Sequence, residues 1–502
     1  MATIAAMDIG SNGIRLTLAD TRNGGYEVIQ SSREAVRLGH DVFNTAAISE
    51  ESIQRSVEAL KKFRIQIDHY SAKHFRAVAT SAVREASNRD RFLKSIEAKC
   101  GIKVQVIGGE EEAYLVYLAA KDKLNFKNKR VLLIDIGGGS VEISLAEKNR
   151  ILFTESYPLG GVRLLQVLNS RGPRRRSFDT VVGEHLKKAQ ERLEEETGDK
   201  RIDLCIATGG SVESIADLRK KNPSQKDNAK ISEAELSSVI ESLQEMSLEQ
   251  RIQDLGLRPD RADVIVPAGI VLQKIMQGAG ITEVFIPGIS LREGVLGQIA
   301  TELHEGHARE HQEQVTSWVY QLGRKYAFDE RHATVVAKLA LEIFDQTQAF
   351  HELGPERRLL LEVSALLHDL GHFVNVSGHH KHSYYLIKAS PLIGLSAGEV
   401  DIVANVTRYH RKSPPSNRHT AFTELSQGDR SIVLTLAAIL RLADALDCEH
   451  SGKVEGVNFE FGEKQFIMRV KAKGDLALAK WALGSKADLF KEVFKADVIV
   501  DE

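Results

Sequence analysis

The chain has 502 residues, of which 42% are hydrophobic and 27% are charged, and its formal net charge is −2. This length is too great for one hydrophobic core and predicts two to four domains, each with enough apolar residues to bury a core. A charge so close to zero excludes a uniformly basic protein, so any polyanionic ligand would need a local basic groove.

The cysteines and the apolar runs indicate a protein of the cytosol. Cys100, Cys205 and Cys448 lie far apart in the sequence, which argues against a disulfide framework and against zinc held by cysteines. Residues 1–10 (MATIAAMDIG) lack the basic start of a secretory signal and reach an aspartate early. The apolar run 432–440 is too short to cross a bilayer. We therefore expect a cytoplasmic protein that does not enter the membrane.

An internal duplication organises the first part of the chain. Residues 4–20 (IAAMDIGSNGIRLTLAD) match residues 131–147 (VLLIDIGGGSVEISLAE). The match aligns Asp8 with Asp135, Gly10 with Gly137, and Arg15 with Glu142. A second pair of segments, 79–85 and 207–213, follows in the same order and at nearly the same offset, which makes chance similarity a poor explanation.

Each copy has the pattern of a mixed α/β unit. A continuous apolar run before each glycine turn predicts a strand buried on both faces, and the alternation after the turn predicts a hairpin partner with one buried face. Helical spacing predicts helices at 49–68, where Ser49 is the N-cap, and at 110–124, where acidic residues occupy the first turn. We expect the two units to form a cleft.

The two turns have the features of phosphate sites. Glycine lets backbone N–H groups approach a phosphate closely, and the turns 10–13 (GSNG) and 137–140 (GGGS) each follow an aspartate. Two related turns favour a phosphate clamp over a plain hairpin turn, and neither fits the Walker or dinucleotide pattern. Asp8 and Asp135 would hold Mg²⁺, which offsets the charge of a phosphoanhydride; the alternative is an aspartate that caps its turn.

At these positions the sequence resembles the Ppx/GppA family, exopolyphosphatases and guanosine pentaphosphate phosphohydrolases of the sugar kinase–Hsp70–actin superfamily. The resemblance covers nearly the whole chain, and the stretches that carry it are MDIGSNGIRL, ATSAVREA, IGGEEEAYL, IDIGGGSVEIS, PLGGVRL, ATGGS, LGLRPDRADVIVPAGIVL and ISLREGVL. The resemblance implies an α/β fold of two actin-like (ribonuclease H-like) lobes that form a cleft, with lobe I at 1–125 and lobe II at 126–305.

The resemblance also implies the roles of individual residues. Glu112, with Glu111 as the fallback, would activate the attacking water, and Asp8, Asp135 and Glu142 would hold Mg²⁺ or Mn²⁺. The implied phosphate ligands are Ser11, Asn12, Gly13, Arg84, Gly137, Gly138, Gly139, Ser140, Gly209, Gly210 and Ser211.

Each role has a structural alternative. Acidic residues in the first turn of a helix can serve only to stabilise it, Glu142 can be an exposed strand residue, and Arg84 can be a solvated helix residue. Residues 292–294 (REG) would close lobe II and can be purely structural. The basic run 171–176 is by default a surface loop, although it could draw a polyanion towards the site.

The last third of the chain differs in composition. Thirteen of the 17 histidines lie between His304 and His450, and the polar stretch 304–314 indicates a domain boundary. Helical spacing predicts helices at 315–328, 331–347, 357–374 and 431–447. Residues 457–494 predict a small strand pair and a terminal helix. We therefore expect an all-α domain with a small C-terminal α+β segment at 306–502.

This domain carries a second set of metal-binding residue types. His332, the adjacent pair His368 and Asp369, and Asp444 resemble the ligand set of HD-superfamily metal phosphohydrolases, which implies an HD-like domain and a second divalent metal. Four more histidines could extend the set: His372, His379, His380 and His410. The alternative is that the histidines pack between helices and the aspartates face solvent.

The sequence predicts an exopolyphosphatase that removes terminal phosphate processively from inorganic polyphosphate by metal-assisted attack of water. One alternative keeps the site and changes the substrate to guanosine pentaphosphate. Two others are an actin-like ATPase or sugar kinase and a non-catalytic alarmone sensor. We expect no nucleic-acid or membrane partner, and the family resemblance implies a homodimer.

Overall fold

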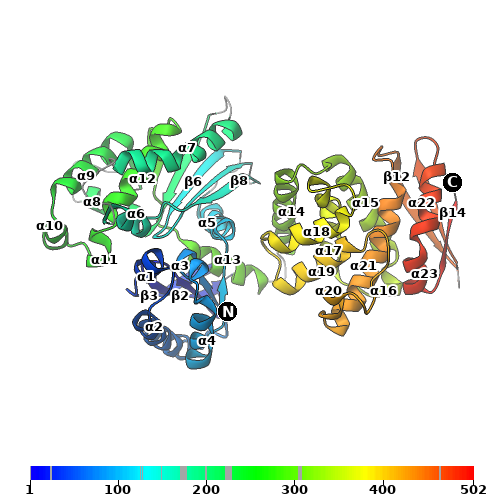
Figure 1. Ribbon diagram of the computed structural model, residues 1–502, viewed down its shortest axis with the longest axis horizontal. Helices are drawn as coiled ribbons and strands as arrows, with labels where there is room; N and C mark the ends of the chain where they lie inside the picture. Colours follow the sequence, from blue (N-terminus) through cyan, green and yellow to red (C-terminus); the bar gives the residue numbers. More distant parts are fainter. Residues whose placement is uncertain are drawn as a thin grey trace. The chain divides into compact units, whose positions relative to one another are not determined.

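The computed structural model describes residues 2–22, 25–124, 126, 128–148, 150–169, 178–197, 201–220, 229–303, 308–462 and 465–501. The chain divides into two compact units, Met1–His307 and Ala308–Glu502 (Figure 1). The first unit contains both predicted lobes. The boundary lies close to the expected one at 305/306.

Lobe I is built on a five-stranded sheet with the order β3-β2-β1-β4-β5. Its strands are β1 (Thr3–Ile9), β2 (Ile14–Arg22), β3 (Gly25–Glu34), β4 (His74–Ala79) and β5 (Val104–Val106). Its helices are α1 (Leu38–Thr45), α2 (Glu50–His69), α3 (Ser81–Glu85), α4 (Arg89–Cys100) and α5 (Gly109–Lys123). Ser49 caps α2 by accepting a hydrogen bond from the backbone N–H of Ser52, as predicted.

Lobe II repeats this arrangement in a six-stranded sheet with the order β10-β11-β9-β6-β7-β8. Its strands are β6 (Arg130–Ile136), β7 (Val141–Glu147), β8 (Arg150–Tyr157), β9 (Leu204–Thr208), β10 (Lys230–Ser232) and β11 (Glu283–Phe285). β6 pairs antiparallel with β7 and parallel with β9, just as β1 pairs with β2 and β4. Asp8 pairs with Arg15 and Asp135 with Glu142 across the hairpins, which confirms the predicted duplication.

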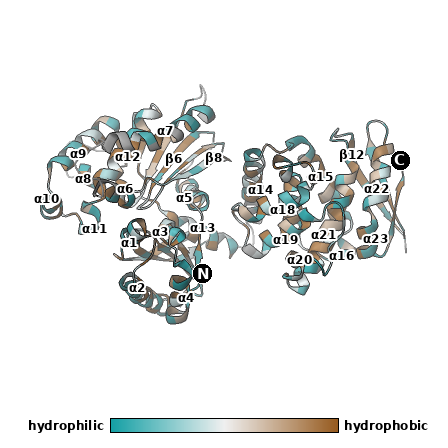
Figure 2. Ribbon diagram, viewed as in Figure 1, coloured by the Kyte–Doolittle hydropathy of each residue, from teal (hydrophilic) through white to brown (hydrophobic). Residues whose placement is uncertain are grey.

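The helices of lobe II surround its sheet, and Figure 2 shows hydrophobic residues along the strands and hydrophilic residues on the outer helical turns. They are α6 (Gly161–Asn169), α7 (Phe178–Thr197), α8 (Gly210–Lys220), α9 (Glu233–Glu245), α10 (Leu248–Gln253), α11 (Pro259–Ala262) and α12 (Ile265–Gly278). The next helix, α13 (Leu291–Glu302), packs instead against α5 and against strands β1 to β4 of lobe I. Gly294 lies where α13 crosses α5; a Cβ there would lie 2.0 Å from Leu115 O, so this glycine is needed for close helix packing.

The second hairpin strand of lobe II has two buried faces, so the prediction of one buried face is wrong. Val141, Ile143 and Leu145 join the core that contains residues of α7 and α12. The opposite face is covered by α5, which packs against β7 and β8. This covered face carries Glu142, so α5 and β7 bring acidic residues from distant parts of the sequence together.

The second unit is mainly helical, with α14 (Ala308–Lys325), α15 (Glu330–Gln346), α16 (Gln348–His351), α17 (Pro355–Leu367), the 3-10 helix η1 (Leu370–Phe373), α18 (His379–Ala389), α19 (Ala397–Arg408), α20 (Thr420–Thr423) and α21 (Gln427–Leu446). Helix α21 is buried from Thr435 to its end and forms the centre of this unit. None of the described helices is both long and apolar enough to cross a lipid bilayer.

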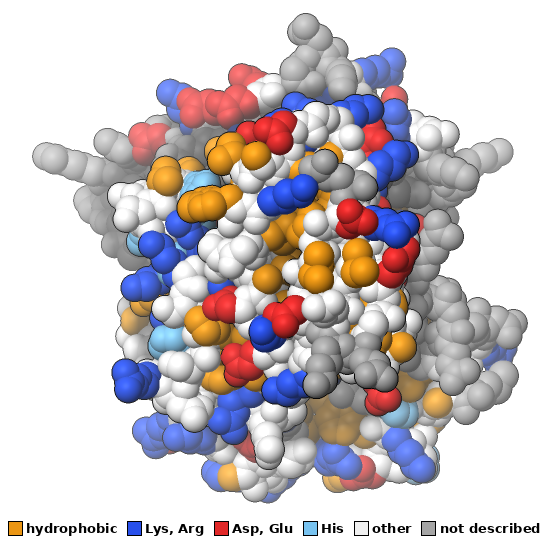
Figure 3. All heavy atoms as spheres, turned by 90° about the vertical axis from the view of Figure 1, so that its right-hand side faces the viewer, with side chains coloured by type: hydrophobic (Ala, Val, Ile, Leu, Met, Phe, Trp, Pro, Cys, Tyr) orange, Lys and Arg blue, Asp and Glu red, His pale blue; other side chains and the backbone are white. Residues whose placement is uncertain are grey.

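The C-terminal segment has more structure than the predicted strand pair and single helix. It contains β12 (Val454–Phe461), β13 (Gln465–Ala472), α22 (Ala477–Lys486), α23 (Asp488–Phe494) and β14 (Asp497–Asp501). Strand β14 adds to β13 in parallel, beyond the range that the sequence analysis considered. Figure 3 views the side with these elements, where hydrophobic side chains lie among mixed charges; the exposed apolar residues of this segment include Phe461, Leu478, Trp481 and Ile499.

Candidate active site

A cavity of about 590 Å³ lies between the two lobes of the first unit. Both glycine turns line it, 10–13 from lobe I and, apart from Gly139, 137–140 from lobe II. The turns are closed in the same way, because the N–H of Gly10 donates to Gly13 O (3.2 Å) and the N–H of Gly137 donates to Ser140 O (3.0 Å). The two duplicated hairpins therefore face one shared site.

Glycine is required at Gly209 in the wall of this cavity and at Gly139 beside it. Gly209 has a φ of +107°, and a Cβ there would lie 2.3 Å from Ile136 O. Gly139 packs against lobe I, since a Cβ there would lie 2.2 Å from Ser81 Oγ. Ser81 Oγ in turn lies 2.9 Å from Ser11 Oγ. These close approaches hold the backbone N–H groups of the turns around the cavity.

Four carboxylates gather on one side of the cavity. Asp8 and Asp135 are the last but one residues of β1 and β6, Glu112 lies in the first turn of α5, and Glu142 lies on β7. Ligand atoms of Glu112, Asp135 and Glu142 all lie within 4.8 Å of one another. Glu142 is only 1% exposed, which rules out the alternative of an exposed strand residue. Among the described residues, Oε2 of Glu112 and Oε2 of Glu142 have no hydrogen-bond partner.

The pKa values of these carboxyl groups reflect their crowding. Burial, followed by the charges of Glu142, Asp135 and Asp8, raises the pKa of Glu112 well above its usual value. Burial raises the pKa of Asp135 to about 8, with Glu142 and Asp8 adding to the shift, and burial raises the pKa of Glu142 to about 7. Crowded buried carboxylates, with one oxygen each of Glu112 and Glu142 lacking a hydrogen-bond partner, call for a compensating cation. Hard oxygen ligands suit Mg²⁺ or Mn²⁺, so the site fits a divalent metal.

Arginines also line the cavity, and one of them, Arg15, pairs through Nη1 with Asp8 Oδ2 (3.1 Å). They are Arg15, Arg33, Arg258, Arg261 and Arg292. Arg261 donates from Nη1 to Ser211 Oγ (2.5 Å), and burial lowers its pKa to about 10. The cavity thus joins a cluster of acidic residues to a cationic wall, an arrangement that suits a metal-bound, polyanionic phosphate chain.

The sequence analysis missed most of this cationic wall. Arg258 and Arg261 lie in LGLRPDRAD, a stretch that carried the family resemblance without an assigned role. Arg33 lies on β3, and no local motif marks it. Arg292 was described as part of a structural segment, yet its side chain lines the cavity. Only the fold brings these side chains together.

Most of the predicted phosphate ligands line the cavity. They are Ser11, Asn12, Gly13, Gly137, Gly138, Ser140, Gly209, Gly210 and Ser211, together with the predicted metal or catalytic residues Asp8, Glu112 and Asp135. Asn12 is partly engaged already, because its Nδ2 donates to Asp260 O (2.7 Å). Of the remaining predictions, Glu142 belongs to the carboxylate cluster, whereas the basic run 171–176 lies outside the described residues.

Arg84 and Glu111 do not line the cavity. Arg84 donates from Nη1 to Ile107 O (2.8 Å), and the same atom lies 4.0 Å from Glu112 Oε2. Arg84 is therefore not a solvated helix residue, and its charge lowers the pKa of Glu112. Its role as a phosphate ligand stays a prediction. Glu111 accepts a hydrogen bond from Gln105 Nε2 (3.2 Å), away from the other carboxylates.

Comparisons with known proteins agree with this geometry. The chain matches the model of the Ppx/GppA phosphatase family at residues 17–303 and that of Ppx/GppA phosphatase, domain III, at residues 316–491. The chain belongs to the Ppx/GppA phosphatase family. This confirms the resemblance seen in the sequence. As a Ppx/GppA phosphatase it is a hydrolase that acts on phosphoric acid anhydrides.

Its curated relatives extend over both units. Guanosine-5′-triphosphate,3′-diphosphate pyrophosphatase from Photobacterium profundum is 26% identical over 81% of this chain and 80% of that protein. The protein of the same name from Vibrio vulnificus is 26% identical over 90% of each. The crystal structure of an exopolyphosphatase from Cytophaga hutchinsonii is 26% identical, with a TM-score of 0.56, over 60% of this chain and 99% of that one.

The predicted ligands of the second unit also come together. His332 comes from α15, His368 and Asp369 follow α17, and Asp444 lies on α21. The potential ligand atoms of His332, His368 and Asp444 lie within 4.8 Å of one another. These aspartates do not simply face solvent, because Asp444 is only 8% exposed. The family match describes this part as domain III, so the HD-like assignment stays a prediction.

Proposed function

We propose that this Ppx/GppA phosphatase removes the terminal 5′-phosphate of guanosine pentaphosphate. The observation that supports the choice of substrate is that relatives aligned over both units carry the name of a guanosine-5′-triphosphate,3′-diphosphate pyrophosphatase. The sequence analysis placed inorganic polyphosphate first and this nucleotide second, and the comparisons favour the reverse order. The cavity geometry supports the reaction class, since it joins carboxylates to arginines beside phosphate-binding turns.

Inorganic polyphosphate remains a second candidate for the same site. It is favoured by the Cytophaga hutchinsonii exopolyphosphatase, whose structure covers 60% of this chain. Both substrates end in a phosphoanhydride and present a chain of negative charges. The same clamp would hold either one.

In the proposed reaction, the backbone N–H groups of the two glycine turns and the cavity arginines hold the terminal phosphates. Glu112 orients a water molecule and accepts its proton as the water oxygen bonds to the terminal phosphorus. The bond from that phosphorus to the bridging oxygen breaks, and the shortened polyanion leaves with this oxygen. Asp8, Asp135 and Glu142 would hold Mg²⁺ or Mn²⁺, which when bound offsets the charge of the transferring phosphoryl group.

The test is phosphate release by the full chain with Mg²⁺ from guanosine pentaphosphate and from polyphosphate of defined length. The proposal expects a higher kcat/KM for the nucleotide, with guanosine tetraphosphate as the product. A higher value for polyphosphate would restore the first interpretation of the sequence. Tight nucleotide binding without phosphate release would favour the alarmone sensor, and ATP-dependent transfer to a sugar would favour a kinase.

Two further proposals are a homodimer, which the family resemblance supports, and a cytoplasmic location, which the widely separated cysteines support. Light scattering of the purified full chain tests the first, because a dimer has twice the mass of the 55.6 kDa chain. Fractionation of cells that produce the protein tests the second.

A further inference from the structure

Beyond the phosphate turns, the cavity of the first unit is lined by residues of a different kind. They are Asp217 and Leu218 of α8 and, from the segment between α10 and α11, Leu255 and Leu257. We call these four residues the outer pocket. The three leucines are half-buried and pack against the core of lobe II, so part of each apolar side chain is left to face the cavity. The proposed reaction uses none of these side chains.

Helix α8 connects the outer pocket to the phosphate site. β9 pairs with β6 so that Thr208 lies beside Asp135, and α8 begins two residues later, at Gly210. Gly210, Ser214 and Asp217 have the spacing of one helix face, and all three line the cavity. At roughly 1.5 Å per residue, Asp217 lies about 10 Å along the helix axis from Gly210. This is the order of separation between the terminal phosphate and the base in a nucleoside triphosphate.

A tight turn holds two of the leucines in place. Gly256 lies between them with a φ of +70°, a left-handed conformation that favours glycine. The N–H of Leu257 donates to Arg251 O (3.3 Å) in the last turn of α10, and Arg251 Nε donates to Leu243 O (2.8 Å). Leu255 and Leu257 therefore present their apolar surface in fixed positions.

The outer pocket favours an uncharged ring over further phosphate groups. Leucine side chains offer a phosphate no hydrogen-bond donor, and the negative charge of Asp217 repels it. The arginine that follows the leucines, Arg258, has its Nε 3.5 Å from Asp260 Oδ1, which offsets part of its charge. Apolar surface beside one well-placed polar group is typical of small-molecule sites, and proteins bind unstacked bases through apolar contacts and hydrogen bonds.

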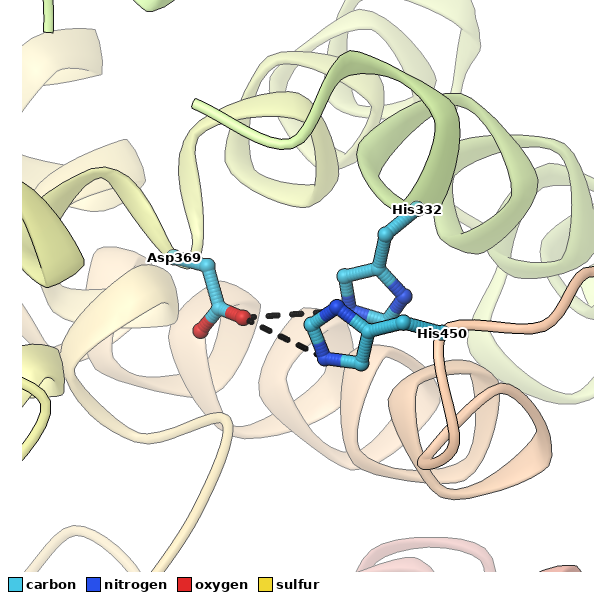
Figure 4. Close-up of side chains that lie close together, drawn as sticks. All are labelled: His332, Asp369 and His450. Carbon is cyan, nitrogen blue, oxygen red and sulfur yellow. Dashed lines mark ion pairs between the residues drawn. The ribbon is translucent and has the colours of Figure 1, made fainter. Parts of the chain in front are cut away.

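The carboxylate of Asp217 lacks the surroundings of a cation site. Among the described residues, no group of ligand atoms that could hold a metal ion includes Asp217. In the second unit, by contrast, the carboxylate of Asp369 is directed at two stacked imidazoles, those of His332 and His450 (Figure 4). An ionised carboxylate only accepts hydrogen bonds, so beside leucines it suits the N–H donors of an uncharged ring.

We propose that the outer pocket binds the guanine base of the nucleotide. Asp217 accepts hydrogen bonds from the N1–H and 2-amino groups of the base, and the three leucines pack against the ring. The phosphate chain then follows α8 towards the turn at 209–211, and the terminal phosphorus lies beside the carboxylate cluster. This inference rests on the proposed function, because it takes the polyanion in the cavity to carry a guanosine.

Asp217 makes the pocket selective among polyanions. Adenine presents an unprotonated N1 to the same carboxylate and has no 2-amino group, so lone pairs would face a negative charge. Inorganic polyphosphate has no base, so it gains nothing from the leucines and meets the charge of Asp217. The outer pocket therefore separates two substrates that the phosphate turns alone would hold equally well.

The experiment measures kcat/KM of the full chain with Mg²⁺ for guanosine pentaphosphate, for its adenosine counterpart and for inorganic tripolyphosphate. We expect Asp217→Asn to lower the value for guanosine pentaphosphate roughly 10- to 100-fold, because hydrogen bonds to a charged group are lost. The value for tripolyphosphate should stay the same or rise. Asp254→Asn is the matched control, since it alters an exposed aspartate beside Leu255 that is outside the cavity lining.

A second variant tests the apolar contact. Leu257→Ala should raise KM for guanosine pentaphosphate several-fold and change KM for tripolyphosphate little. Calorimetric binding of guanosine tetraphosphate to each variant gives a readout that does not depend on turnover. Circular dichroism shows whether each variant is folded.

The outcomes separate this inference from the proposed function. If tripolyphosphate is the better substrate but Asp217→Asn still weakens the binding of guanosine tetraphosphate, the proposed function is wrong and the base site stands. If guanosine pentaphosphate is the better substrate but Asp217→Asn behaves like Asp254→Asn, or the adenosine counterpart reacts equally well, the base site is wrong and the proposed function stands. If guanosine tetraphosphate does not bind to the unaltered chain, both are wrong.

Discussion

Arg84 Nη1 lies 4.0 Å from Glu112 Oε2, although Arg84 does not line the cavity. Burial and the neighbouring carboxylates raise the pKa of Glu112, and the charge of Arg84 opposes them by lowering it. A general base must be ionised to accept a proton, so we expect Arg84 to favour the ionised form that the proposed role of Glu112 needs. The sequence analysis assigned Arg84 to substrate phosphate, and the structure favours a positioning and electrostatic role.

Arg84→Ala should therefore change the pH dependence of hydrolysis. Without the guanidinium, the pKa of Glu112 rises, so the acidic limb of the kcat/KM profile moves to higher pH while KM at high pH changes little. Arg89→Ala, an exposed arginine in the next helix, is the control and should leave the profile in place. A large increase in KM with an unmoved acidic limb would instead support the phosphate-binding role.

Glu112→Gln should lower kcat by about 10²–10⁴-fold, the usual contribution of a general base, and leave KM within a few-fold. The matched control is Glu111→Gln, which removes an acid from the same helical turn but not from the carboxylate cluster. Steady-state phosphate release separates the two residues. Near-normal kcat in Glu112→Gln with a severe loss in Glu111→Gln would transfer the role to the fallback residue.

The sequence was informative wherever function follows a local pattern. Asp8 and Asp135 were predicted because a duplicated strand–turn–strand unit places them at equivalent positions, and Glu112 and Glu142 because the family resemblance implies their roles. Arg33 could not be predicted, because β3 carries no sequence motif. Only the formation of the sheet brings the Arg33 side chain to the cavity. The same holds for Asp447, whose contact with His332 spans 115 residues of sequence.

The connection between the lobes leads to a stability prediction. Asp260 of α11 pairs with Arg33 of lobe I and accepts a hydrogen bond from Asn12. Asp260→Ala leaves a largely buried arginine without its partner and should lower the free energy of unfolding by about 3 kcal/mol. Lys62→Ala, which breaks an exposed pair with Glu34, should change the free energy of unfolding far less. Urea unfolding followed by fluorescence measures the free energy of unfolding of both variants. Equal losses in Asp260→Ala and Lys62→Ala would show that the contact between the lobes is not stabilising.

The carboxylate cluster should make the metal-free first unit less stable as the pH rises. Folding raises the pKa of Asp135 from 3.8 to about 8 and that of Glu142 from 4.5 to about 7. Between these limits the folded state binds more protons than the unfolded state, so stability is fully present below pH 4 and is lost progressively up to about pH 8. Calorimetry in chelator from pH 5 to pH 8.5 should show the Tm of the first unit falling, and Asp135→Asn should make this fall smaller.

Adding Mg²⁺ should restore Tm mainly at the high end of this pH range, because only the ionised carboxylate cluster binds the ion. A Tm that is independent of pH, or a Mg²⁺ effect equal at pH 5 and pH 8, would mean that these acids do not share a proton-linked metal site.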